Sequence, residues 1–367
     1  MAGRPRTNPR LRAPRPPPYR PDAPLPRAVS ATARGSLSAS KSDHVFVMTD
    51  PKPAHPPTAQ PMIVDWETNR RFRSAAEAMG LDPDDQWVGG YVAVEWEGVR
   101  YLLSAYAGNI EGKALLEFGC NYAASSIVAA TLGARVTGVD VDPAAIALAQ
   151  LNAERHGIAD RIRLALVTDT RTLPYEDASF DIILCISVLE YVEPDHLPAV
   201  LAEIDRVLKP GGLVIVSGTA SRLAPREVHS GRWLVNYWPR ALDRSLLGLA
   251  KPLQRGVNPL PILRAFRGYA NLDLADRGVR WCAARAAMGQ SATKLRVAQM
   301  LGRLLRPFGL SIGMAGASFS AAWGKPLGAT GPKRGGATNP PRFSRGNAEP
   351  QLRAPANVPQ FERKKRP

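Results

Sequence analysis

The stretch Ala-Leu-Leu-Glu-Phe-Gly-Cys-Asn-Tyr-Ala-Ala, at residues 114–124, carries the strongest indication of the fold. It opens with a short apolar run, 114–118, which is typical of a buried strand. Mostly small residues follow at 119–123, Tyr122 excepted, and they let the backbone approach a ligand closely. Residues 124–132 are predicted as a helix that ends at Gly133. The first amides of such a helix have no partners within it, so this turn is a candidate ligand site.

The same alternation of strand and helix continues along the chain. Asp142 followed by Pro143 predicts the start of a helix that runs to His156 and stops at Gly157. Apolar residues at three- and four-residue spacing predict a second amphipathic helix over 197–208, ended by Pro210-Gly211-Gly212. Further short apolar runs predict strands at 136–139, 162–167, 181–186 and 213–217. This order predicts an α/β fold, with a doubly wound, mostly parallel sheet and helices on both faces.

The regions on either side of this core are also expected to fold. Helices are predicted at 66–79 and 92–107, and a closing helix over 292–306. Residues 310–314 and 318–323 are expected to pair as an antiparallel hairpin, because the link between them is short. The region 218–290 is less regular and rich in Arg, Trp and Tyr, and we expect it to form a cap over the ligand site.

The charge of the chain lies at its two ends. Residues 1–60 carry +7 and residues 325–367 carry +8 of the formal net charge of +16, which leaves +1 for 61–324. The Pro- and Arg-rich ends are predicted to be disordered tails around one domain at 61–324. They are interpreted as solvated tails. One alternative is that they tether the domain to nucleic acid or acidic lipid, and another is that the protein starts later, at Met48 or Met62. An organelle transit peptide is disfavoured, because thirteen prolines in 1–60 oppose an amphipathic helix.

Cysteine content and hydropathy bear on the compartment. The three cysteines form no C-x-x-C pair and cannot all be paired within the chain, which fits a reducing compartment. No apolar run approaches the length of about 18–20 residues that spans a bilayer. A cytoplasmic location without a membrane span is therefore expected.

Ligands of open parallel sheets bind beyond the carboxyl ends of the strands, so the residues that follow each strand are the candidates. A carboxylate that ends an apolar strand, as Asp140 does, needs a polar partner. The candidates are Glu117, Gly119, Cys120 and Asn121 after the first strand, Asp140 and Val141 after the second, Asp169 and Thr170 after the third, and Ser187 after the fourth.

These segments resemble the motifs of one enzyme family, the class I S-adenosylmethionine-dependent methyltransferases. Residues 116–120 are similar to its first motif, and 138–140 to the turn with its ribose-binding acid. Residues 173–192 are similar to the segment around its fourth strand, and 208–212 to the turn before its fifth. The resemblance covers about 115–217. It implies a Rossmann-like sheet of seven strands whose last strand is antiparallel, S-adenosylmethionine as cofactor, Asp140 on the ribose and Asp169 on adenine.

The first motif departs from the family pattern at two positions. The family usually has glycines where this chain has Asn121 and Ala123. Asparagine tolerates left-handed backbone angles better than most residues, and alanine adds only a methyl group. The departure leaves cofactor binding plausible, and it leaves a non-catalytic binding scaffold open as an alternative function.

The resemblance implies methyl transfer by in-line displacement, and a small-molecule, lipid-type or sugar-type acceptor is the expected partner. The protein then mainly aligns the acceptor and excludes water, with no metal, and a base is needed only where the acceptor holds a proton of high pKa. His229 is the first candidate base and Tyr191 the second. Glu190, Glu227, Trp233 and Tyr237 are further candidates near the acceptor.

Two other functions are possible for a sheet of this kind. A nucleic-acid methyltransferase aided by the basic tails remains the alternative, although 187–190 lack the Pro-Pro-aromatic loop of enzymes that methylate base amino groups. A nicotinamide-dependent oxidoreductase is disfavoured, because the chain has no G-x-G-x-x-G turn and no Tyr-x-x-x-Lys. The oligomeric state stays open.

Overall fold

The computed structural model describes residues 59–229, 231–239, 255–314 and 316–328. Most of the two expected tails, 1–60 and 325–367, therefore lies outside the described residues. In the described part of the chain, no helix is both long and apolar enough to cross a membrane.

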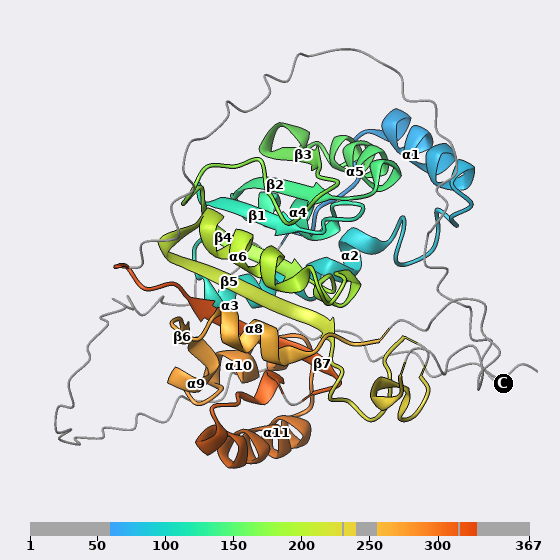
Figure 1. Ribbon diagram of the computed structural model, residues 1–367. Helices are drawn as coiled ribbons and strands as arrows, with labels where there is room; N and C mark the ends of the chain where they lie inside the picture. The colour runs from blue at the N-terminus through green and yellow to red at the C-terminus, as the bar shows by residue number, and fades with distance from the viewer. Residues whose placement is uncertain (1–58, 230, 240–254, 315, 329–367) are drawn as a thin grey trace, which may run out of the picture. The chain divides into compact units, whose positions relative to one another are not determined.

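A seven-stranded sheet, in the order β3-β2-β1-β4-β5-β7-β6, forms the centre of the fold (Figure 1). Strands β1 to β5 are mutually parallel, and β7 is antiparallel to both of its neighbours. The predicted α/β class, with one antiparallel strand at the end of the chain order, is confirmed. The strands are β1 (Ala114–Phe118), β2 (Arg135–Asp140), β3 (Ile162–Leu166), β4 (Phe180–Ile186), β5 (Leu208–Ala220), β6 (Ala270–Asn271) and β7 (Ser318–Gly324).

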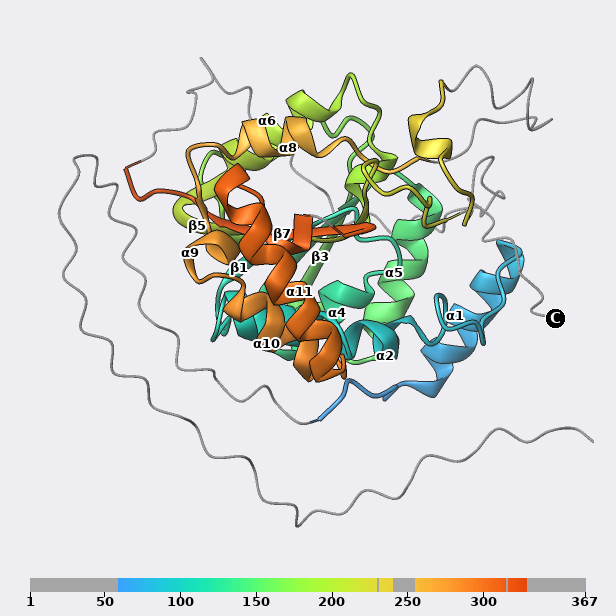
Figure 2. The same cartoon turned by 90° about the horizontal axis from the view of Figure 1, so that it is seen from below.

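Helices cover both faces of the sheet because successive strand residues point to opposite sides. Leu115 belongs to the core formed with α2, α3, α4 and α10, whereas Leu116 belongs to the core formed with α6 and α8. Figures 1 and 2 show these two layers from perpendicular directions. The helices are α1 (Trp66–Ala78), α2 (Tyr91–Trp96), α3 (Val99–Tyr106), α4 (Ala124–Thr131), α5 (Pro143–Arg155), α6 (Leu197–Val207), α8 (Pro259–Ala265), α9 (Leu272–Ala275), α10 (Val279–Ala287) and α11 (Ala292–Leu305).

The predicted helix over 92–107 is wrong in one respect, because two helices, α2 and α3, occupy this stretch. The chain leaves the helical path at Glu97 and Gly98, and Gly98 is the N-cap residue of α3. Glycine loses more backbone freedom in a helix than any other residue, so interrupting the helix at Gly98 costs less than interrupting it elsewhere.

The predicted hairpin of 310–314 with 318–323 is also wrong. Residues Ile312–Met314 form a 3-10 turn, and β7 lies between β5 and β6. Both edges of β7 are thus hydrogen-bonded to other strands, and it has no edge left for 310–314.

The fifth strand is longer than the predicted 213–217. It begins at Leu208 and accommodates Pro210-Gly211-Gly212 as a bulge, where its register against β4 shifts. Lys325 holds this irregular start in the sheet, because its N–H donates to the carbonyl of Gly212 over 2.8 Å and its carbonyl accepts from Gly211 over 3.0 Å. The expected cap region, 218–290, also supplies the edge strand β6 and the helices α8, α9 and α10.

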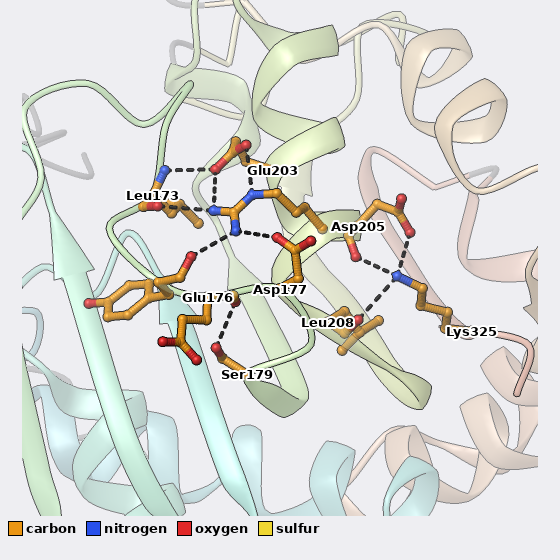
Figure 3. A network of polar contacts seen from close by, with 10 residues as sticks. Leu173, Glu176, Asp177, Ser179, Glu203, Asp205, Leu208 and Lys325 are labelled. Carbon is orange, nitrogen blue, oxygen red and sulfur yellow. Dashed lines mark hydrogen bonds and ion pairs between the residues drawn. The ribbon is translucent and has the colours of Figure 1, made fainter. Parts of the chain in front are cut away.

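A buried network of polar contacts fixes the segment that leads into β4 (Figure 3). The guanidinium of Arg206 on α6 donates to both carboxylate oxygens of Glu203, to the Asp177 carboxylate and to the carbonyls of Leu173 and Tyr175, at 2.7–3.0 Å. These five bonds match the five N–H donors of the side chain. The segment 173–179 is therefore tied to α6.

Candidate functional site

The turn between β1 and α4 has a left-handed backbone at three alternate residues. Gly119, Asn121 and Ala123 have φ angles of 76°, 47° and 60°. A Cβ atom at Gly119 would lie 2.2 Å from Cγ2 of Val188, so only glycine fits where this turn meets the segment after β4. Ala123 is the N-cap residue of α4 and provides no side-chain hydrogen bond to the first turn of that helix.

Asp140 holds this turn from the end of β2. Its Oδ2 accepts from the N–H of Asn121 over 2.8 Å, and its Oδ1 accepts from the N–H of Asp142 over 3.1 Å. Each carboxylate oxygen has more than one acceptor position, so both oxygens can also accept from a ligand hydroxyl. Asp142 itself caps α5 by accepting from the N–H of Ala144, as the sequence predicts. The neighbouring Val141 is exposed.

Glu117 is buried beneath the same turn and points toward the start of α4. Its carboxylate accepts from the hydroxyl of Ser126. Burial raises the pKa of Glu117 to about 8, against the lowering effect of the hydrogen bonds from Ser126 and Ser125, and the charge of Glu95 on α2 raises it further. Burial likewise raises the pKa of Glu95 to about 7, while hydrogen bonds from Ser125 and Tyr91 oppose the rise. Two acidic groups thus lie close together, and their carboxylates are hydrogen-bonded by serine hydroxyls and a phenol.

The candidates after β3 and β4 are exposed or partly exposed. The Asp169 carboxylate is bound by the guanidinium of Arg171 in a two-pronged pair, at 2.9 and 3.0 Å, and this hydrogen bonding lowers the pKa of Asp169 to about 2. Thr170 lies beside it, partly exposed. Ser187 has a φ of 48° and its N–H donates to the carbonyl of Ser217 over 2.9 Å, which fixes the end of β4 against β5.

Tyr191 and His229, the two candidate bases, form a hydrogen-bonded chain with Glu227. The Tyr191 hydroxyl lies 3.3 Å from Nε2 of His229, and Nδ1 of His229 lies 2.7 Å from Oε1 of Glu227. Glu227 is buried, with 1% of its surface exposed, whereas Tyr191 is 43% exposed. The hydrogen bond to Glu227 raises the pKa of His229 above its usual value. A carboxylate on Nδ1 selects the tautomer whose Nε2 is the basic atom.

Tyr91 links the two halves of the site, and the sequence does not single it out. Burial raises its pKa well above the usual value, and the charges of Glu95, Glu117 and Tyr191 all contribute to the rise. Tyr91 is therefore within electrostatic reach of the buried acid on one side and of the candidate base chain on the other. The available signal is the spacing of Tyr91 and Glu95, which places them one turn apart on the same face of α2.

Comparison with known proteins identifies the domain that carries this site. Residues 116–216, from β1 to the middle of β5, match the family model described as a methyltransferase domain. The chain carries a class I S-adenosylmethionine-dependent methyltransferase domain. The matched span includes the turn 119–123, Asp140 and the segment after β4, and Tyr91 and His229 lie outside it on either side.

The methyltransferase domain has curated relatives with different acceptors. A ubiquinone biosynthesis O-methyltransferase of Maricaulis maris is 30% identical over 154 residues, which are 39% of this chain and 56% of the relative. A sterol 4-C-methyltransferase of Caenorhabditis elegans is 36% identical over 101 residues, 28% of this chain and 29% of the relative. A ribosomal protein L11 methyltransferase of Tolumonas auensis is 33% identical over 131 residues, 35% of this chain and 42% of the relative.

The chain thus spans about half or less of the length of these relatives. Their names cover a quinone pathway, a sterol and a protein, so they leave the acceptor of the methyltransferase domain open.

The residues of the site fit S-adenosylmethionine, the cofactor of this family. The cofactor carries a positive sulfonium and an ammonium group. The buried Glu117 and the partly buried Glu95 are hydrogen-bonded by hydroxyls and a phenol, so a cationic ligand would favour their charged forms. Asp140 offers two oxygens at the end of β2. The left-handed Asn121 and Ala123 adopt the backbone that glycine would have, so the departure from the family pattern leaves the turn intact.

Proposed function

We propose that the protein transfers the methyl group of S-adenosylmethionine to an apolar small molecule that bears an ionisable hydroxyl group. The hydrogen-bonded chain Tyr191–His229–Glu227 carries this proposal. A histidine whose Nδ1 is held by a buried carboxylate presents Nε2 as a base, and such a base is useful only where the acceptor must lose a proton.

The surface around His229 supports an apolar acceptor. Residues 223–237, which carry Glu227 and His229, expose several large apolar side chains. These are Leu223, Val228, Trp233, Leu234 and Tyr237, with exposed fractions of 49–65%. Large exposed apolar groups that gather beside polar catalytic candidates are typical of binding surfaces for apolar ligands.

In the proposed mechanism the bound cofactor supplies a methyl group that is already activated as a sulfonium. Asp140 would hold the ribose hydroxyls, and Glu117 with Glu95 would face the cationic part of the cofactor. His229 would accept the acceptor's proton at Nε2, and Glu227 would keep the ring in the right tautomer and stabilise the charged imidazolium. Tyr191, next to Nε2, would position the acceptor hydroxyl.

The test separates cofactor binding from proton removal. Calorimetric titration of the full chain should show S-adenosylmethionine binding that Asp140→Ala abolishes and His229→Gln leaves unchanged. With a panel of hydroxylated aromatic and isoprenoid acceptors, release of S-adenosylhomocysteine should fall by about 100-fold or more in His229→Gln, in the range of general base catalysis.

The pH profile gives a second readout. The neutral form of His229 is the active base, so kcat/KM should rise with pH through a pKa above that of an ordinary histidine. Glu227→Gln removes the negative charge and weakens the hydrogen bond that together raise this pKa, so the rise should move to lower pH. Full activity of His229→Gln on every accepted substrate would overturn the proposed role of His229 as base. Absence of S-adenosylmethionine binding by the wild-type chain would overturn the proposed methyl transfer.

A further inference from the structure

Helix α11 exposes its most apolar face to solvent. No residue of α11 is buried. Its inner side consists of the partly buried Leu295, Ala298, Gly302 and Leu305, and Gly302 lies against Ile312. The side chains on the opposite face recur at three- and four-residue spacing, which makes one continuous stripe on a helix. They are Val297, Met300, Leu301, Leu304 and, just past the helix end, Phe308, which are 47–77% exposed.

Both edges of this apolar stripe are basic. The segment 291–311 contains Lys294, Arg296, Arg303 and Arg306 and no acidic residue. At about 100° per residue, Lys294 falls beside one edge of the stripe, and Arg296 and Arg303 fall beyond the other. An apolar stripe with cationic edges is the pattern of helices that lie in the interface of a membrane, where the apolar face enters the acyl boundary and the cations meet acidic headgroups.

The position of α11 favours a flat occupant. Figure 1 places it at the outer edge of the fold, beyond α10, and Figure 2, which views the fold from that side, shows it in front. The inner face of α11 already packs on the fold, so only the outer face is available for a partner. A helix with one free face can lie flat on a planar surface. A second copy docked face to face would bring four basic side chains near four others, which is electrostatically unfavourable. The sequence after β7 adds a charge of +8 over 325–367.

We propose that the outer face of α11 docks this protein onto the surface of an anionic phospholipid membrane. The stripe supplies apolar burial and the basic edges supply attraction to acidic headgroups, two signals that together give stable but reversible binding. This proposal does not depend on the acceptor or on the base chain. It would place the methyltransferase domain beside acceptors that dissolve in membranes.

The test is flotation of the full chain with vesicles of phosphatidylcholine alone or mixed with phosphatidylserine. Binding is expected to the mixed vesicles only, and to weaken as salt rises. The double change Met300→Gln/Leu304→Gln should lower the partition coefficient by about tenfold or more. Leu260→Gln is the matched control, because Leu260 on α8 is 52% exposed and lies outside the stripe, and it should leave binding unchanged.

Three outcomes would overturn the proposal. The wild-type chain could fail to bind acidic vesicles. The double variant could bind as the wild type does, which would assign binding to charge elsewhere in the chain. Light scattering could show a dimer that the double variant abolishes, with no vesicle binding, which would make the stripe a contact between copies. Calorimetry with S-adenosylmethionine on the double variant keeps these outcomes distinct from a failure of the cofactor site.

Discussion

Replacement of Arg206 is expected to be among the most destabilising changes in the chain. Its side chain is 6% exposed and all five of its N–H donors are bonded (Figure 3). Arg206→Ala would leave the buried Glu203 carboxylate and the carbonyls of Leu173 and Tyr175 without their donor. Loss of one partner from a buried ion pair costs about 3–5 kcal/mol.

Two milder variants test whether geometry or charge matters. Arg206→Lys keeps the positive charge but offers three donors in place of a planar fork, and we expect a loss of about 2 kcal/mol. Asp177→Asn weakens the ion pair between Asp177 and Arg206. The Asp177 side chain is 49% exposed, so we expect the free energy of unfolding to fall by at most about 1 kcal/mol. The expected order of destabilisation is therefore Arg206→Ala, then Arg206→Lys, then Asp177→Asn.

Urea unfolding of the full chain, followed by circular dichroism, measures this order. Stability changes should appear as lower midpoints with similar slopes, and Arg206→Ala should lower Tm by roughly 10 °C or more. A stability of Arg206→Lys equal to that of the wild type would refute the argument from the five-donor fork. An Arg206→Ala loss no larger than that of Asp177→Asn would show that the network contributes little.

Two further changes probe the site through stability. Gly119→Ala should lower the free energy of unfolding by about 2–4 kcal/mol, because of the left-handed backbone and the overlap with Val188. In a Val188→Ala background the same change should cost at least about 1 kcal/mol less. Strict additivity in this double-mutant cycle would contradict the predicted overlap. The pKa values of Glu117 and Glu95 are raised to about 8 and about 7. Between about pH 5 and pH 8 the folded state therefore holds protons that the unfolded state has released. The free energy of unfolding should fall as pH rises through this range, by up to about 1.4 kcal/mol per pH unit for each group. Glu117→Gln should flatten this slope in urea midpoints measured across that range, and an unchanged slope would assign it to other groups.

The central part of the fold can be predicted from local sequence because each element there carries its own signal. Residues Ala114–Phe118 are apolar apart from Glu117, and the strand has the predicted bounds. Asp142 and Pro143 specify the start of α5 through a side-chain cap and a fixed φ. Parallel strands then bring their carboxyl ends together, which is why Asp140 meets the turn at Asn121 across 19 residues of sequence.

The features that escaped prediction depend on contacts between distant segments. The place of β7 is set by β5 and β6 on its two sides, and nothing within 310–323 reveals those partners. The pairing of Glu95 with Glu117 likewise arises from packing of α2 on α4. The sequence predicts the base chain only in part, because residue type and position favour His229 and Tyr191 but do not distinguish Glu227 from the other acids near them.

The position of β7 also has a consequence for how the protein folds during synthesis. Strands β1 to β5 leave the ribosome in order and can pair as they emerge, since domains commonly fold from the N-terminal side. The free edge of β5 and the whole of β6 must wait for residues 318–324 before either finds its neighbour. A nascent chain that pauses after α11 would therefore present an unprotected sheet edge to other chains, and this interval is when a chaperone would be most useful.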